Sequence, residues 1–480
     1  MGAITAVVTK EEQDTANAIL TMIKELAHRG KVAYGIATAK EQTLANSIEK
    51  LCPEKLRSNI GLGYVFSKTL PTDAPLLIKT DNFTFVFEGR THPPININEK
   101  LQPNPQKTAE GIIKNCDGAY VFAIATPDVL IVGRDTLGLA PLYFAKNKSS
   151  IAFASERKAL WKLGLKTAES FPPGNIATIK SQSFSFKPVK TVKQPKVKPL
   201  DMKFAAEKLQ RLLLQSVKVR VSDVKEVAVA FSGGLDSGTV AFLAKKCMVN
   251  VELITVSLEN MPETSHAEDA AKALALPIHT RTISVNDVEK TLPKVLWLIE
   301  DPDPVQASIA LPLFWTAEHA KKHGFKVLLS GQGADELFGG YHRYLSIYAE
   351  KSPEELQKTL FRDVARCYET NFQRDSHACA FHQVELRLPF ADFRVVNFAL
   401  SLPLSLKIDS SADLLRKRVL RQAAENMHVP QLIVCKTKKA VQYATGITKT
   451  LQTLAKRENL NTSDYVRKVF QKIYPDVKTE

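Results

Sequence analysis

The alternation of apolar and polar residues divides the chain into a first part rich in strands and a second part in which strands and helices alternate. In residues 1–186, short apolar runs between turn residues predict strands. These strands are expected at Gly118–Ala125, Val129–Gly133, Pro141–Ala145 and Ile151–Ser155. Apolar residues at helical spacing predict one helix in this part, from about Asp14 to His28.

The second part, residues 201–480, shows the pattern of an α/β protein. Strands are predicted at Glu226–Ala230, Val249–Ser257, Ile278–Thr282 and Phe325–Leu329. Helices are predicted at about 204–219, 266–275, 288–300 and 310–323. Strands that alternate with helices are typical of a parallel sheet with helices on both faces. Beyond residue 341 the pattern predicts helices only.

A segment rich in lysine and proline separates the two parts. Residues 187–199 have no apolar periodicity, which favours an extended linker. We therefore expect a domain at 1–186, a linker at 187–200 and a second domain at 201–480. At 480 residues the chain is long enough for two domains with cores of their own.

Composition and charge limit the kinds of protein this can be. No apolar run is long enough to cross a membrane, and the start of the chain lacks the features of a signal peptide. The six cysteines are scattered without a Cys-x-x-Cys pair, which indicates a reducing cytoplasm and argues against a zinc or iron–sulfur site. The net charge of +15 fits either nucleic acid or small anionic substrates, and we favour the latter because no nucleic-acid-binding module is recognisable.

The clearest chemical signal follows the predicted strand Glu226–Ala230. The residues Ser232, Gly233, Gly234, Leu235, Asp236 and Ser237 form a tight turn of small residues before a predicted helix. Glycines let the backbone approach a ligand, and free N–H groups at a helix start bind anions. Asp236 would repel phosphate, so we interpret it as a Mg²⁺ ligand, although an ordinary N-capping aspartate is the simpler alternative. The loop lacks the Gly-Lys-Ser/Thr of a Walker A motif and resembles the pyrophosphate loop of ATP pyrophosphatases.

A second loop, after the strand that ends at Leu329, has the same arrangement of small residues followed by an acidic residue. Ser330, Gly331 and Gln332 precede the acid Asp335. Ligands of parallel sheets bind at the carboxyl ends of the strands, so Asp236 and Asp335 are expected on neighbouring loops. Two carboxylates and a triphosphate make an ordinary Mg²⁺ environment.

With both loops in view, the chain resembles the glutamine-dependent asparagine synthetase family over nearly its whole length. In the first part the resemblance rests on residues 133–143, 153–160 and 171–174. In the second part it rests on Gln373-Arg374-Asp375, on residues 384–392 and on the late lysine motif of residues 436–443, preceded by a basic stretch at 415–421 that reads as helical. The lysine motif is closest to the version in archaeal members and in eukaryotic asparagine-synthetase-domain proteins.

The resemblance implies a fold of combined α/β and α+β class. It consists of an N-terminal Ntn-hydrolase-like α/β/β/α sandwich, then a parallel-sheet ATP-pyrophosphatase domain with C-terminal helices. It also implies that ATP adenylates the side chain of aspartate and that ammonia then displaces AMP. Ser232, Gly233, Gly234 and Ser237 would hold pyrophosphate, and Asp236 and Asp335 would hold Mg²⁺.

The resemblance assigns further roles around the nucleotide. Val256, Ser330 and Gly331 would line the nucleotide pocket, and residues 300–308 would border the acid. Lys438 would stabilise the charge that develops on the acyl-adenylate, unless it is only a solvated member of the run Lys436–Lys439. Gln332 would take a catalytic role at the position where many members of the family carry a glutamate tied to forming the aspartyl-adenylate. The chain departs from the family pattern here, because glutamine keeps the hydrogen bonding but loses the charge.

The first domain departs from the family pattern at the residues that hydrolyse glutamine. Gly2 replaces the N-terminal cysteine nucleophile, and an internal cysteine cannot take its place. Glu88 replaces the asparagine that helps to build the oxyanion hole, where a carboxylate would repel the oxyanion. We therefore expect this domain to be inactive as a glutaminase and ammonia to come free or from a separate source.

Three alternatives remain open from the sequence. The ligase could form an amide or lactam on another carboxylic acid, the chain could be a non-catalytic regulatory homologue, or it could be a tRNA-modifying pyrophosphatase. The intact phosphate loop argues against the second, and the third would need an RNA-binding appendage. A homodimer is compatible with the sequence, which does not determine it.

Overall fold

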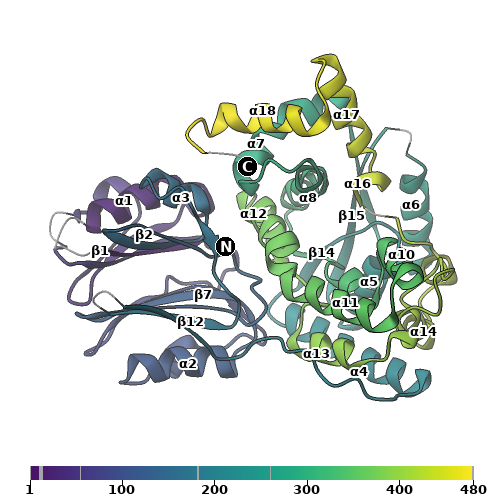
Figure 1. The fold of residues 1–480 in the computed structure, drawn as a ribbon, viewed down its shortest axis with the longest axis horizontal. Helices are drawn as coiled ribbons and strands as arrows, with labels where there is room; N and C mark the ends of the chain where they lie inside the picture. Colours follow the sequence, from purple (N-terminus) through teal and green to yellow (C-terminus); the bar gives the residue numbers. More distant parts are fainter. Residues whose placement is uncertain are drawn as a thin grey trace. The chain divides into compact units, whose positions relative to one another are not determined.

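The computed structural model describes residues 2–9, 15–53, 56–180, 183–259, 261–439 and 441–477, and the chain forms two compact units. The first unit is Met1–Thr191 and the second is Val192–Glu480 (Figure 1). The division between them falls within the segment of lysine and proline residues. The final strand of the first unit extends into that segment as far as Pro188.

The first unit is built on two antiparallel sheets stacked face to face (Figure 1). One sheet has the order β11 (Glu169–Ser170), β9 (Tyr143–Lys146), β10 (Ser150–Ala154), β1 (Ala3–Thr9), β4 (Ile60–Phe66), β2 (Ala33–Ala37), β3 (Gln42–Ala45). The other has the order β13 (Ser183–Pro188), β12 (Asn175–Lys180), β8 (Val129–Arg134), β7 (Gly118–Ala125), β6 (Thr84–Thr91), β5 (Leu77–Lys79).

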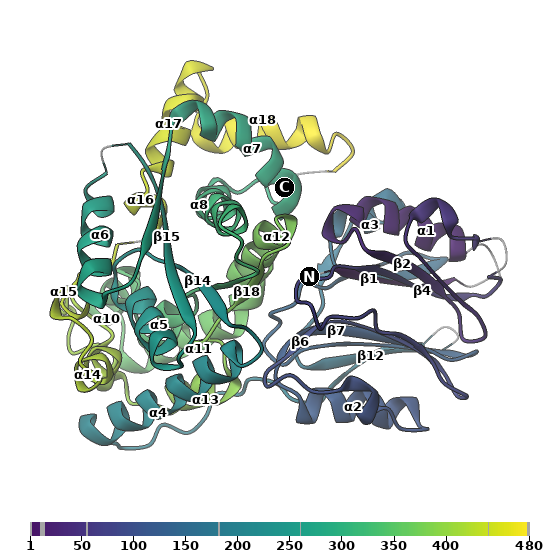
Figure 2. The ribbon, with the colours of Figure 1, turned by 180° about the vertical axis from the view of Figure 1, so that it is seen from behind.

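Helices cover the outer faces of this pair of sheets. α1 (Thr15–Leu26) and α3 (Arg157–Lys162) pack on the first sheet, and α2 (Pro105–Asn115) packs on the second (Figures 1 and 2). Three clusters of buried apolar side chains follow these layers, one between the sheets and one under each helical layer. The α/β/β/α sandwich expected from the sequence is thereby confirmed, and α1 ends two residues before the expected end, where a short 3₁₀ turn, Ala27–Arg29, continues the chain.

The second unit contains a five-stranded parallel sheet. Its order is β16 (Ile278–Ile283), β15 (Asn250–Leu258), β14 (Glu226–Ala230), β17 (Val327–Leu329), β18 (Glu385–Arg387). The parallel sheet predicted from the alternation of strands and helices is confirmed. The expectation of helices alone beyond residue 341 is wrong at β18, because this strand has three residues and includes two charged side chains that are buried. Such a strand leaves no apolar run in the sequence.

Helices surround the sheet on both faces, so that β15 lies between α6 and α8 in both views (Figures 1 and 2). In chain order, these helices are α4 (Met202–Val221), α5 (Leu235–Lys246), α6 (Pro262–Leu274), α7 (Val285–Ile299), α8 (Pro304–Lys322), α9 (Ala334–Phe338), α10 (Arg343–Glu350), α11 (Pro353–Cys367), α12 (Gln373–Phe381), α13 (Phe393–Ser401), α14 (Arg418–Asn426), α15 (Gln431–Val434), α16 (Val441–Ala444), α17 (Ile447–Arg457) and α18 (Thr462–Ile473). Among the described residues, no helix combines the length and apolar character that a membrane span requires.

Two helices begin at places that the periodicity did not predict. α8 starts at Pro304, six residues before the expected start, because the Asp303 carboxylate caps it by accepting hydrogen bonds from the N–H groups of Val305 and Gln306. α14 starts only at Arg418, so the first three residues of the basic stretch 415–421 lie outside a helix. The later start of α14 leaves Lys417 outside a helix.

Candidate active site

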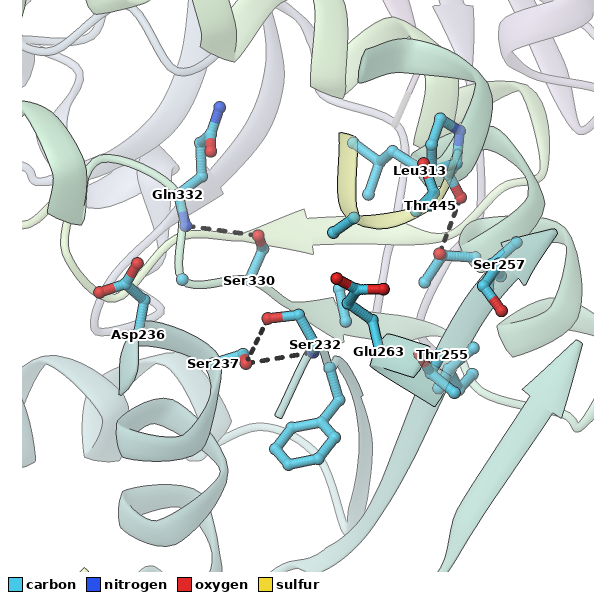
Figure 3. A pocket seen from close by; sticks show the side chains of 18 of the residues that line it. Ser232, Asp236, Ser237, Thr255, Ser257, Glu263, Leu313, Ser330, Gln332 and Thr445 are labelled. Atoms are coloured by element: carbon cyan, nitrogen blue, oxygen red, sulfur yellow. Dashed lines mark hydrogen bonds between the residues drawn. The ribbon is translucent and has the colours of Figure 1, made fainter. Parts of the chain in front are cut away.

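A cavity of about 180 Å³ lies at the carboxyl ends of β14, β15 and β17 (Figure 3). It brings together these residues predicted for the site: Ser232, Asp236, Ser237, Val256, Ser330, Gly331, Gln332, Asp335 and Lys438. Gly234 and Leu235 line a smaller cavity of about 50 Å³, which shares Ser232, Asp236 and Lys438 with the first. Gly233 lines neither cavity and instead forms the turn between β14 and α5.

Hydrogen bonds between Ser232 and Ser237 fix the shape of the first loop, residues 232–237. The Ser232 N–H donates to the Ser237 hydroxyl at 3.2 Å, and the two hydroxyl oxygens are also 3.2 Å apart (Figure 3). Gly233 has a φ of +70°, and a Cβ there would lie 2.9 Å from the Ala267 Cα, so only glycine fits. The turn thus presents the first N–H groups of α5, the arrangement that binds phosphate at helix starts.

The second loop packs directly on the first. A Cβ on Gly331 would lie 2.8 Å from the Asp236 Cβ, so the loops touch only because this residue is glycine. The Gln332 N–H donates to the Ser330 hydroxyl at 3.4 Å, and the Gln332 side chain points away from this contact (Figure 3). The two acid-bearing loops therefore meet at one edge of the sheet.

Four charged side chains form a network where the loops meet. The Lys417 Nζ lies 2.6 Å from Asp236 Oδ2 and 2.6 Å from Asp335 Oδ1. The Lys438 Nζ lies 2.7 Å from Asp335 Oδ2 and 3.5 Å from Asp236 Oδ2. The two carboxylates are mostly buried, and the two ammonium groups balance their charge.

The network fixes the charge of its members. Burial by itself would raise the pKa of Asp335, but the neighbouring Lys417 and Lys438 outweigh burial and hold that pKa well below its usual range. Burial would lower the pKa of Lys438, but Asp335 and Asp236 outweigh it and raise that pKa. Lys438 is consequently a permanent cation suited to electrostatic stabilisation, and it cannot serve as a base near neutral pH.

Lys417 is the member of the network that the sequence did not single out. It and Arg416 both have left-handed backbone conformations, with φ of +54° and +52°, just before α14 begins. A Cβ on Gly340 would lie 2.0 Å from Asp335 Oδ1 and 2.2 Å from the Lys417 Cε, so Gly340 makes room for the pair. A lysine that interrupts an expected helix gives no periodic signal. In the sequence, the stretch 415–421, which contains Lys417, is marked only by the family resemblance.

Cations surround the smaller cavity beside the first loop. It is lined by Lys417, Arg421, Lys436, Lys438 and Lys439 together with Ser232, Gly234 and Leu235. The Arg421 guanidinium donates to backbone oxygens of Leu415, Arg416 and Lys436, which orients this cationic wall. A pocket with several cations and a helix start suits a multiply charged anion.

Comparison with known proteins decides the family. The Asparagine synthase profile matches residues 208–355 and 348–473, and the profile of a glutamine amidotransferase domain matches residues 75–162. A provisionally named glutamine-hydrolyzing asparagine synthetase 1 of Methanocaldococcus jannaschii is 31% identical over 95% of this chain and 96% of its own length. The chain belongs to the asparagine synthase family. By class it is therefore an ATP-dependent carbon–nitrogen ligase of the asparagine synthetase type.

Other relatives align over less of their length. The asparagine synthetase of Asparagus officinalis is 28% identical over 71% of this chain and 60% of its own, and that of Bacillus subtilis is 28% identical over 61% and 53%. Among solved structures, a glutamine phosphoribosylpyrophosphate amidotransferase of B. subtilis matches with a TM-score of 0.32 and 16% identity, over 58% of this chain and 65% of that one. An NMN synthetase of Francisella tularensis matches with a TM-score of 0.29 and 14% identity, over 59% and 89%.

In this member of the asparagine synthase family, α8 and α12 form another wall of the larger cavity. Thr316 of α8 and Asp375 of α12 line it, as does Ile309, which directly follows residues 300–308. Residues 300–308 do not themselves line this cavity, and their place beside the acid stays a prediction. The segment contacts α12, since Arg374 donates to the Gln306 side chain at 2.8 Å. Asp375 is buried, which raises its pKa, and the Arg374 Nε donates to it at 2.8 Å.

In the first domain, Gly2 and Glu88 stand at the positions that the family uses to hydrolyse glutamine, and they contact each other. The Gly2 N–H donates to Glu88 Oε1 at 2.5 Å, and the Arg29 Nε donates to the Gly2 carbonyl at 2.7 Å. Burial raises the pKa of Glu88. A Cβ on residue 2 would lie 1.9 Å from the Val65 carbonyl oxygen, so the backbone here accepts glycine and no larger residue without moving.

The carboxylates of the site determine which metal ion fits there. Within the described residues, no three histidine, cysteine or acidic side chains already converge on one point as metal ligands. Asp236 and Asp335 supply two carboxylates at one cavity, which fits Mg²⁺ because this ion keeps several water or phosphate ligands beside one or two carboxylates. Lys417 and Lys438, which contact both carboxylates, also line the smaller cavity.

Proposed function

We propose that this chain is an AMP-forming amide ligase that adenylates the side-chain carboxylate of aspartate and aminates it with ammonia. The observation that carries the proposal is the convergence of both small-residue loops, Asp236, Asp335 and Lys438 on one cavity at the carboxyl edge of the sheet. The membership of the asparagine synthase family supports the same reaction. Other carboxylic acids are separate outcomes of the test below.

The proposed reaction assigns a task to each side of the site. The first loop and the cationic wall around Lys436 and Arg421 would bind the β- and γ-phosphates and retain them as pyrophosphate. Val256, Ser330 and Gly331 would position the nucleotide so that the acid attacks the α-phosphorus. Asp236 and Asp335 would hold Mg²⁺, which supplies charge neutralisation at the phosphate oxygens.

After adenylation, the chain would have to favour attack by ammonia over attack by water. Lys438, fixed by Asp335, would stabilise the negative charge on the tetrahedral intermediate formed at the acyl carbon. Gln332 can hydrogen bond to the acyl group but carries no charge. Two acidic side chains outside the four-charge network also line this cavity, Glu263 and the buried Asp375.

The first prediction concerns products and the acid substrate. ATP–pyrophosphate exchange, measured with purified chain and a panel of acids that includes aspartate, glutamate and N-substituted amino acids, should be stimulated by aspartate. AMP and pyrophosphate should form in equal amounts during amide synthesis. Formation of ADP and phosphate alone would exclude the proposed chemistry, and stimulation by a different acid would move the proposal to that acid. Exchange with none of them would favour a non-catalytic homologue.

The second prediction concerns the nitrogen donor. Amide formation should depend on ammonium and should not occur with glutamine, because residue 2 offers no thiol and Glu88 places a carboxyl group against it. The Gly2→Cys variant should not gain glutaminase activity, since its Cβ would meet the Val65 carbonyl oxygen at 1.9 Å. The measurement is glutamate release alongside amide formation, with ammonium-dependent activity of the variant as the control for folding. Glutamate released by the unmodified chain at the rate of amide formation would contradict the prediction.

A further inference from the structure

Three histidines gather at a place that the ligase reaction does not use. His279 lies near the start of the edge strand β16, and His319 and His323 lie one turn apart at the end of α8. The ring centroids of His279 and His323 are 3.9 Å apart, those of His319 and His323 are 4.6 Å apart, and those of His279 and His319 are 6.3 Å apart. Two separate elements thus bring three imidazoles into one group.

A carboxylate supports one ring of this group. His279 Nε2 lies 2.5 Å from Glu252 Oε2, and Glu252 belongs to the neighbouring strand β15. A carboxylate that holds one ring nitrogen orients the imidazole and raises the basicity of the other nitrogen, which is how metal-binding histidines are commonly supported. In the described part of the chain, the rings of His319 and His323 make no hydrogen bond to another residue, so their nitrogens remain available.

We propose that His279, His319 and His323 bind a transition-metal ion such as Zn²⁺, with Glu252 as the supporting carboxylate. Histidines at positions i and i+4 of a helix present two nitrogens on one face, the spacing used by helical zinc sites. The rings do not yet converge on one point, so binding requires them to turn about their side-chain bonds. His323 is exposed and His279 and His319 are only partly buried, which leaves space for that movement.

The charges around the group are compatible with a cation. Burial lowers the pKa of His319 to about 4, assisted by His323, Arg281 and His279. Burial and His279 also lower the pKa of His323. Arg281 and Lys322 are cations near the group, and Arg281 is paired with Glu318.

This group is separate from the proposed Mg²⁺ carboxylates. Thr316 of α8 lines the active-site cavity, whereas His319 and His323 follow it on the same helix, about 5 Å and about 10 Å along its axis at the usual rise per residue. The ligand types also differ, because imidazole selects zinc, nickel or copper and carboxylates with phosphate select Mg²⁺. The inference therefore stands whether or not the proposed acid substrate is correct.

The test uses full-length protein without a polyhistidine tag, stripped with a chelator and titrated at pH 7.5. We expect one Zn²⁺ per chain by calorimetry, and Co²⁺ absorption bands typical of histidine ligands. The double variant His319→Gln/His323→Gln should lose this binding. Glu252→Gln should weaken it about 10- to 100-fold, as loss of a supporting carboxylate does. His342→Gln, at an exposed histidine elsewhere, should bind as the unmodified chain does.

Two results would overturn the proposal. One is the absence of saturable Zn²⁺ and Co²⁺ binding by the unmodified chain at micromolar concentrations. The other is equal binding by the unmodified chain and the double variant, which would place the metal elsewhere. Thermal unfolding of each variant without metal shows whether the fold is retained, and equal melting temperatures are expected because the altered side chains lie at the surface or are only partly buried.

Discussion

The Asp236→Asn variant is expected to lose ATP–pyrophosphate exchange and amide formation by at least about 1,000-fold, roughly 4 kcal/mol. The substitution removes one of the two carboxylates proposed to hold Mg²⁺, and it leaves Lys417 with Asp335 as its remaining close carboxylate. The fold should survive, because Asp236 lies at the edge of the sheet, in the first turn of α5, and not in the apolar core. Exchange assays at saturating Mg²⁺ and thermal unfolding test the two halves of this expectation.

The Asp269→Asn variant is the matched control for this experiment. Asp269 lies on the neighbouring helix α6 and is largely exposed, and its one ion pair within the described residues is with Lys272 at 3.4 Å. The activity of the Asp269→Asn variant should remain within about twofold of that of the unmodified chain, because exposed pairs contribute little. If Asp236→Asn keeps more than a tenth of the exchange activity, the shared-metal proposal fails. Restored activity at high Mg²⁺ would instead indicate that Asp236 affects only metal affinity.

The Lys438→Ala variant is expected to slow amide formation about 100-fold, on the order of 3 kcal/mol, with a smaller effect on the KM for ATP. The reason is the position of its ammonium group, 2.7 Å from Asp335 and at the wall of the cavity where the acyl-adenylate would form. A charge that acts mainly on the transition state changes kcat more than substrate binding. Steady-state kinetics with saturating ammonium measure both quantities.

The neighbouring Lys439→Ala variant separates this role from a general loss of positive charge. Lys439 also lines the smaller cavity, but it pairs with Glu263 and its side chain is about half exposed, so its removal should raise the KM for ATP while changing kcat less than threefold. Equal and mild effects of the two substitutions would contradict the role of Lys438. Equal and severe effects would indicate that the whole lysine segment acts by holding pyrophosphate.

The meeting of the two loops could be predicted from the sequence because it depends on simple rules. Buried apolar strands precede Ser232 and Ser330, and parallel strands bring their carboxyl ends to one edge of a sheet. The spacing of strands and turns predicted a first part rich in strands, and the α/β/β/α sandwich came from the family resemblance. Lys438 was assigned from family resemblance, since a lysine in a charged run gives no local indication of where its side chain points.

The remaining features depend on contacts between distant segments or on backbone conformations that leave no periodic pattern. Lys417 is 181 residues from Asp236 in the sequence, and it reaches the carboxylate through a left-handed backbone that interrupts the expected helix. β18 was missed because buried salt bridges take the place of apolar side chains there, as in the pair of Arg387 with Glu385 at 2.7 Å. The steric exclusion of a side chain at Gly2 likewise depends on the position of Val65, which only the fold determines.

The four-charge network also limits which substitutions its four positions can accept during evolution. Asp236, Asp335, Lys417 and Lys438 come from separate segments of the chain, yet their charges cancel only as a set. Loss of any one leaves a net charge of one unit in this mostly buried set, although every remaining member keeps a partner of opposite charge. Substitutions at these positions should therefore accumulate together or not at all, and Gly340, which leaves space for two of them, should be tied to the same history.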